Sequence, residues 1–122
     1  MPVSAKIDRN NEVVRTTASG LLTKADFIAH IETIWYDRSI ANFDEIVDAR
    51  DADVSALTAA DLAAIVNSGV VYDPASDPRL ALCVDSELTF GLARMFGTLR
   101  ETHVESAREV GVFRDLTSLT AN

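Results

Sequence analysis

Two helix-capping signals constrain the fold of this chain more than any other feature. Thr23-Lys24-Ala25-Asp26 and Thr58-Ala59-Ala60-Asp61 each place an aspartate three residues after a threonine. A hydroxyl at the N-cap and an acid three residues later satisfy the free N–H groups that open a helix. The two boxes therefore predict helices that begin near residues 23 and 58. Each box follows a run suited to a strand, so the chain alternates between strand and helix.

Runs of β-branched or continuously apolar residues predict the strands. The expected strands cover residues 3–8, 12–19, 44–49, 80–84 and 110–113. Asn10-Asn11 predicts a turn, so the first two runs form a hairpin. Leu80 to Val84 is an unbroken apolar run preceded by a proline, which is typical of a strand buried on both faces.

Apolar residues at helical spacing predict three core-facing helices, the first over residues 23–37. The expected stripes are Phe27, Ile28, Ile31, Ile34 and Trp35; then Leu62, Ile65 and Val66; then Leu88, Leu92, Met95, Phe96 and Leu99. Residues 67–78 are expected to be a long connection, and residues near Leu116 a short last helix. The order β-β-α-β-α-β-α-β-α predicts one α/β domain over residues 1–122. Its sheet is mostly parallel with an antiparallel edge.

Charge and cysteine usage exclude several classes of function. Eleven basic against nineteen acidic residues give a net charge of −8, which repels phosphate backbones, so no nucleic-acid partner is expected. The single cysteine, Cys83, excludes an intramolecular disulfide and a CxxC metal site, and it is expected to be buried and inert. No apolar run approaches the length of a membrane helix, so a cytoplasmic protein without membrane insertion is expected.

Three short segments carry a resemblance to a known family: Ile46-Val47-Asp48-Ala49-Arg50, Phe90-Gly91-Leu92-Ala93-Arg94-Met95-Phe96 and Val112-Phe113-Arg114-Asp115. Their order and spacing resemble the STAS-like proteins, specifically the SpoIIAA-like group related to bacterial anti-sigma-factor antagonists and to the lipid-binding Sec14 fold. The resemblance implies a sheet with helices packed mainly on one side. It also implies a role in regulation or ligand binding rather than catalysis.

Antagonists of the wider family carry an Asp-Ser-Ser-Gly-like turn whose serine is phosphorylated. This chain instead has Asp48-Ala49-Arg50-Asp51-Ala52-Asp53-Val54-Ser55 there, so a switch of that type is not expected. Thr58 and then Ser55 are the positions nearest to the family's site where a phosphate could be added. The role of Thr58 as an N-cap already explains this residue, and we favour that interpretation over phosphorylation.

The remaining chemical groups predict no catalytic site, cofactor or metal centre. The acidic cluster of residues 44–53 offers carboxylates to a cation, but it lacks the glycine and distal glutamate of a calcium loop. A solvated loop with local hydrogen bonds is therefore expected. His30 and His103 have no partner at a spacing typical of a triad or metal site, so both are expected at the surface.

The third helix carries the predicted binding surface. Phe90 and Gly97 are expected opposite its core stripe, where an aromatic beside small residues forms a shallow groove. Phe90, Arg94 and Gly97, with Tyr72 from the long connection, are the candidate interface. The first hypothesis is a non-enzymatic regulatory or interaction module with a protein partner or a second copy. The alternative is a carrier or sensor of a small lipophilic molecule held between helices and sheet.

Overall fold

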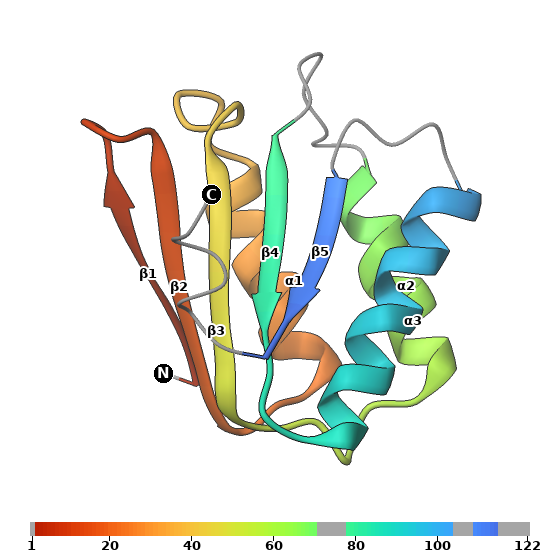
Figure 1. The fold of residues 1–122 in the computed structure, drawn as a ribbon. Coiled ribbons are helices and arrows are strands. Elements are labelled where there is room, and N and C mark those ends of the chain that lie inside the picture. The colour runs from red at the N-terminus through yellow and green to blue at the C-terminus, as the bar shows by residue number, and fades with distance from the viewer. Residues whose placement is uncertain (1, 71–77, 104–108, 115–122) are drawn as a thin grey trace.

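Five strands lie side by side in the order in which they occur along the chain (Figure 1). The computed structural model describes residues 2–70, 78–103 and 109–114. The strands are β1 (Val3–Asp8), β2 (Val13–Leu21), β3 (Asp44–Asp53), β4 (Arg79–Cys83) and β5 (Glu109–Phe113). β1 pairs antiparallel with β2, and every other neighbouring pair is parallel. The predicted mixed sheet with an antiparallel edge is confirmed, and β4 lies between two strands as its apolar run indicated.

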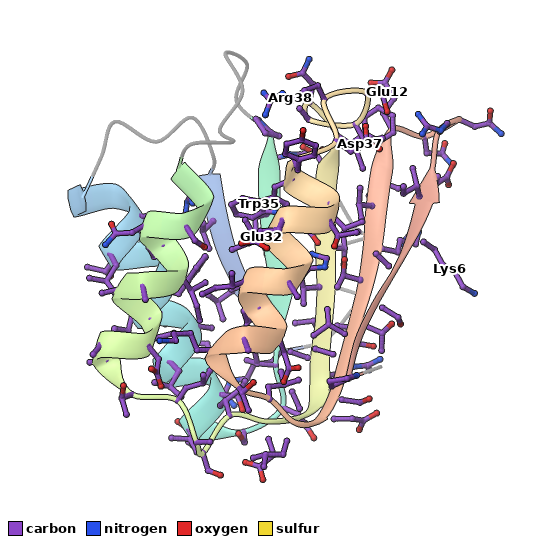
Figure 2. All side chains as sticks on the ribbon, turned by 180° about the vertical axis from the view of Figure 1, so that it is seen from behind. Lys6, Glu12, Glu32, Trp35, Asp37 and Arg38 are labelled. Carbon is purple, nitrogen blue, oxygen red and sulfur yellow. The ribbon has the colours of Figure 1, made fainter. Side chains whose placement is uncertain are left out.

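Every helix that the structure describes covers the same face of the sheet (Figures 1 and 2). The helical segments are α1 (Lys24–His30), the π-helix η1 (Ile31–Trp35), α2 (Ala59–Val70) and α3 (Glu87–His103). The class and the one-sided packing agree with the prediction. α2 continues to Val70, so the expected connection begins later than residue 67. The expected short last helix lies outside the described residues.

The two capping boxes form as predicted. In the first, the Asp26 N–H donates to Thr23 Oγ1 and the Thr23 N–H donates to the Asp26 carboxylate at 2.8 Å. In the second, the Asp61 N–H donates to Thr58 Oγ1 at 3.1 Å and the Thr58 N–H donates to Asp61 at 3.0 Å. Each box satisfies donors that the helix itself leaves free, so it stabilises the start of its helix.

The hydrophobic core fills the layer between the sheet and the helices. Its central buried residues come from β2, the helices, β4 and the segments that join them: Ala18, Leu22, Ile31, Trp35, Val54, Leu57, Leu62, Ile65 and Leu80. Cys83 is fully buried, as predicted.

The face that α3 turns to the core agrees in part with the predicted one. Thr89, Ala93 and Arg100 are buried, whereas Leu88 and Met95 are 53% and 41% exposed. Spacings of four and seven residues put the buried three on one helical face. Leu92, Phe96 and Leu99 of the predicted stripe do pack against the core. The predicted stripe is therefore confirmed for these three residues and wrong for Leu88 and Met95.

None of the helices within residues 2–70 and 78–103 is long and apolar enough to cross a membrane.

Candidate functional site

A carboxylate lies in the core between the sheet and the helices. Glu45, the second residue of β3, is only 3% exposed. Side chains alternate along a strand, so Glu45 shares its face with Val47 and Ala49, and all three line the same cavity. The strand pattern therefore directs a charge into the layer that the helices cover.

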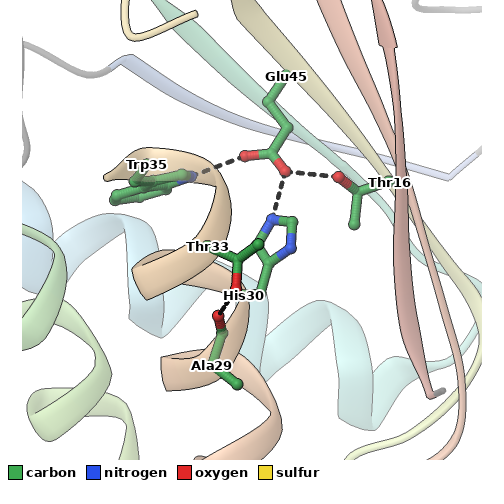
Figure 3. A network of polar contacts seen from close by, with 6 residues as sticks. All are labelled: Thr16, Ala29, His30, Thr33, Trp35 and Glu45. Carbon is green, nitrogen blue, oxygen red and sulfur yellow. Dashed lines mark hydrogen bonds and ion pairs between the residues drawn. The ribbon is translucent and has the colours of Figure 1, made fainter. Parts of the chain in front are cut away.

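Three side chains donate hydrogen bonds to this carboxylate (Figure 3). Thr16 Oγ1, on β2, donates to Glu45 Oε2 at 2.6 Å, and His30 Nε2 lies 2.7 Å from the same oxygen. Trp35 Nε1 donates to Oε1 at 3.0 Å. A buried carboxylate is tolerated when hydrogen bonds replace its water, and both oxygens of Glu45 are bonded. We call Thr16, His30, Trp35 and Glu45 the Glu45 network.

The π-helix places two members of the Glu45 network, His30 and Trp35, on the same side of the helical segment formed by α1 and η1. His30 and Trp35 are five residues apart, which in a regular α-helix separates them by about 140°. η1 instead closes a wider turn, in which the Tyr36 N–H donates to the Ile31 carbonyl at 3.2 Å. Thr33 Oγ1 also donates to the Ala29 carbonyl at 2.8 Å, a contact that often bends helices. The wider turn lets the imidazole and the indole reach the same carboxylate.

Glu45 is held as a carboxylate despite its burial. Burial opposes ionisation and is the largest single influence on its pKa. The hydrogen bond and charge of His30, with the hydrogen bonds of Thr16 and Trp35, together outweigh that influence. The pKa of Glu45 therefore lies below its ordinary value, and the group carries a negative charge at neutral pH.

A buried arginine stacks on the indole of the Glu45 network. The Arg100 guanidinium carbon lies 5.3 Å from the centroid of the Trp35 ring, and Arg100 is 1% exposed. A Cβ at Gly69 of α2 would lie 2.7 Å from Trp35 Cζ3, so only glycine leaves room for this ring. The indole therefore contacts two charged groups, since its Nε1–H donates to the Glu45 carboxylate and its ring stacks against the Arg100 guanidinium.

A cavity of about 120 Å³ opens beside the Glu45 network. Strands β1 to β4 and the helices all contribute to its wall. Its small wall residues are Thr16, Ala18, Ala49, Thr89 and Ala93, and its aromatic wall residues are Phe27, Trp35 and Phe96. The surface that the wall presents is almost entirely apolar. Small side chains on facing elements leave this space unfilled.

The predicted interface residues do not form one groove. Phe90 is half-buried between two guanidinium groups, with that of Arg94 at 5.8 Å and that of Arg114 at 4.5 Å from its ring centroid. Gly97 instead faces β5, since a Cβ there would lie 3.5 Å from Val110 Cγ1. Tyr72 lies outside the described residues. An interface role for Phe90, Arg94, Gly97 and Tyr72 stays a prediction.

The predicted phosphorylation sites lie at the start of α2 and just before it. Thr58 Oγ1 already accepts the Asp61 N–H, and the Ser55 N–H donates to Asp53 Oδ1 at 3.0 Å. Their modification stays a prediction.

The acidic residues 44–53 all lie along β3, which continues beyond the predicted end of this strand at residue 49. The expectation of a loop was therefore wrong for residues 50–53. Two of these acidic side chains form hydrogen-bonded ion pairs with arginines. Arg79 bonds Asp44 at 3.0 Å, and Arg50 Nη2 bonds Asp48 at 2.8 Å. No group of three or more potential metal ligands occurs among the residues the structure describes.

The sequence interpretation missed the Glu45 network. His30 was expected at the surface, but its side chain is 12% exposed and contacts Glu45. Glu45 was grouped with its acidic neighbours, and Arg100 was not singled out. One signal was available: within the strand that begins at Asp44, Glu45 shares the period-two face of Val47 and Ala49.

Comparison with known proteins identifies the fold. No protein-family model matches the chain, and no curated protein is similar to it in sequence. In structure it is similar to an uncharacterised protein of the DUF3478 family with a SpoIIAA-like fold from Shewanella loihica PV-4. The TM-score is 0.61 and the identity 18%, over 98% of this chain and 91% of that one. The chain therefore has a SpoIIAA-like fold, as the resemblance in its sequence implied.

Proposed function

We propose that this domain is a non-enzymatic carrier or sensor that binds a small apolar molecule between its helices and its sheet. The cavity beside the Glu45 network is the observation that carries the proposal. It lies between the central strands and the helices, and its wall is almost entirely apolar. Ligand pockets are typically concave and mostly apolar.

The cavity is costly for a protein of this size. At about 24 cal/mol per Å³ of enclosed void, a space of about 120 Å³ lowers the free energy of unfolding by at most about 3 kcal/mol. That is a large part of the ordinary stability of a domain, about 5–15 kcal/mol. An engineered apolar cavity of about 150 Å³ binds benzene or xenon, so a space of this size can hold a small ligand. A bound ligand would offset the cost of the void.

The only tryptophan of the chain, Trp35, lines the cavity and provides the test. Toluene added to the protein should change Trp35 fluorescence in a saturable way. Native mass spectrometry of freshly purified protein should detect any retained molecule. A fluorescence signal that never saturates with toluene, together with purified protein that carries no small molecule, would contradict the proposal.

A second candidate function is a regulatory module that self-associates through α3. Leu88 and Met95 are both exposed, and they lie seven residues apart, so they share one helical face. Between them Gly91 has no atom near the position of a Cβ, which leaves room for a second backbone. A two-fold contact needs only one such self-complementary strip.

Self-association can be tested by the oligomeric state of the protein. A dimer that Leu88→Glu dissociates, without loss of helix content, would support this second function. A monomer at high concentration would exclude it.

A further inference from the structure

The polar groups in the cavity wall are turned toward one another rather than toward the space. Thr16 Oγ1, His30 Nε2 and Trp35 Nε1 all bond the Glu45 carboxylate. Thr89 Oγ1, the other hydroxyl in the wall, lies 2.9 Å from Ser86 Oγ. A ligand with a polar head would lose its water and would have to compete with these bonds. The wall therefore favours a molecule without a strongly polar group.

The charge behind the wall acts against anions. Glu45 is 3% exposed and belongs to the wall. A second carboxylate brought beside it would lose its hydration and meet a like charge at low dielectric. The nearest basic group, His30, already contacts Glu45 at 2.7 Å, and no other basic side chain in the described part of the chain belongs to the wall. The Arg100 guanidinium is fully buried against the Trp35 ring. An ionised fatty acid could therefore enter only with its carboxylate left outside.

The volume limits the length of the ligand. A space of about 120 Å³ is slightly smaller than the engineered cavity of about 150 Å³ that holds one benzene molecule. An acyl chain of a membrane lipid would have to extend out of this space into water. Trp35, Phe27 and Phe96 present aromatic surface to whatever occupies it.

We propose that the cavity selects compact, uncharged molecules about the size of a single substituted ring, and excludes carboxylates and long acyl chains. This inference rests on the proposed function, since it specifies the ligand of the same cavity. If the inference is correct, this domain does not carry membrane lipids or fatty acids.

The test compares probes that differ in charge or in length. Binding of fluorobenzene and of 4-fluorobenzoate to the full chain is measured by ¹⁹F NMR. Fluorobenzene should bind saturably. 4-Fluorobenzoate should bind about 100-fold more weakly, because it must bury a charge. 1-Dodecanol, which is uncharged but long, should fail to displace fluorobenzene.

Two variants locate the binding in the cavity. Ala93→Leu adds carbon atoms to the wall on α3, so it should abolish fluorobenzene binding while raising the melting temperature. Ala60→Leu makes the same change at an exposed position of α2, so this variant should bind fluorobenzene as tightly as the unmodified protein does.

A third variant tests the role of the charge. Glu45→Gln removes the negative charge, so the difference in affinity between fluorobenzene and 4-fluorobenzoate should fall to about tenfold.

The outcomes distinguish the two proposals. If fluorobenzene does not bind, or if Ala93→Leu binds it as well as Ala60→Leu does, the cavity is not a binding site and the proposed function fails as well. If fluorobenzene binds in the cavity but 4-fluorobenzoate binds equally well, or if 1-dodecanol displaces it, the proposed function stands and this inference is wrong. The probe comparison uses only the unmodified protein, so it decides the question even if a variant does not fold.

Discussion

Replacing Glu45 by glutamine tests whether the Glu45 network stabilises the fold. Glutamine keeps the shape of the side chain but offers one acceptor and one donor group in place of two acceptors. Trp35 Nε1 can only donate, so the amide oxygen must accept from it. The amide nitrogen then faces Thr16 and His30, and both must change from donor to acceptor.

The expected decrease in the free energy of unfolding can be estimated from these hydrogen bonds. Hydrogen bonds to a charged group contribute about 1.5–3 kcal/mol each, and neutral ones about 0.5–1.5 kcal/mol. Weakening the bonds of 2.6, 2.7 and 3.0 Å would cost a few kcal/mol. The amide avoids the desolvation of a buried charge, which offsets part of that cost. We expect Glu45→Gln to lower the free energy of unfolding by about 2 kcal/mol at pH 7.

The pH dependence provides a second readout. The folded-state pKa of Glu45 is below the ordinary value of 4.5, so its contribution to stability is complete above that value. The contribution is lost as the pH falls through the folded-state pKa. One such proton changes stability by at most about 1.4 kcal/mol per pH unit. Glu45→Gln should therefore flatten the loss of stability below about pH 4.5.

Urea unfolding followed by circular dichroism between pH 7 and pH 3 measures both effects. Asp48→Asn is the matched control, because it makes the same type of change on the same strand. Asp48 pairs with Arg50 in a partly exposed position, so this control should alter stability little. If Glu45→Gln is within about 0.5 kcal/mol of the unmodified protein and keeps its pH dependence, the network does not stabilise the fold.

Three further substitutions follow from local geometry, each measured by thermal unfolding. Gly69→Ala should destabilise by about 1–3 kcal/mol, because its Cβ would overlap Trp35; a neutral result would mean that the indole can move. Gly91→Ala, on an open helical face, should instead stabilise by about 0.5–1 kcal/mol, and a loss there would show that this position is packed. Thr23→Ala should cost about 1 kcal/mol by removing the cap of α1, whereas no change would indicate that Asp26 alone satisfies the helix start.

Local sequence signals were sufficient for most of the fold. Thr23 and Thr58 cap helices through bonds to residues three positions away, so the capping boxes depend only on adjacent sequence. The apolar run from Leu80 forms β4, which lies between β3 and β5 in the sheet as predicted. These features do not depend on which elements meet across the core.

The face that α3 turns to the core could not be predicted from local sequence signals in the same way. By spacing, Leu88 and Met95 belong to one stripe with Leu92, Phe96 and Leu99. The last three pack against the core, yet Leu88 and Met95 are exposed while Thr89 and Ala93 are buried. The choice depends on how closely the helix approaches the sheet, and that distance is set by other elements. An amphipathic pattern with apolar residues on two adjacent faces therefore leaves the rotation of a helix undetermined.

The sequence alone determined the fold class, the order of the strands and helices, and the two capped helix starts. The tertiary structure decided the candidate site. Glu45 is an ordinary acidic residue of an acidic segment until the helices cover its face of β3 and Thr16 of the neighbouring β2 bonds it. His30 and Trp35 reach it only because the π-helix changes their angular separation, and Arg100 reaches the indole from a helix far along the chain. Caps and strand patterns arise from contacts between near neighbours, whereas a buried polar network and a cavity arise from the packing of segments distant in sequence.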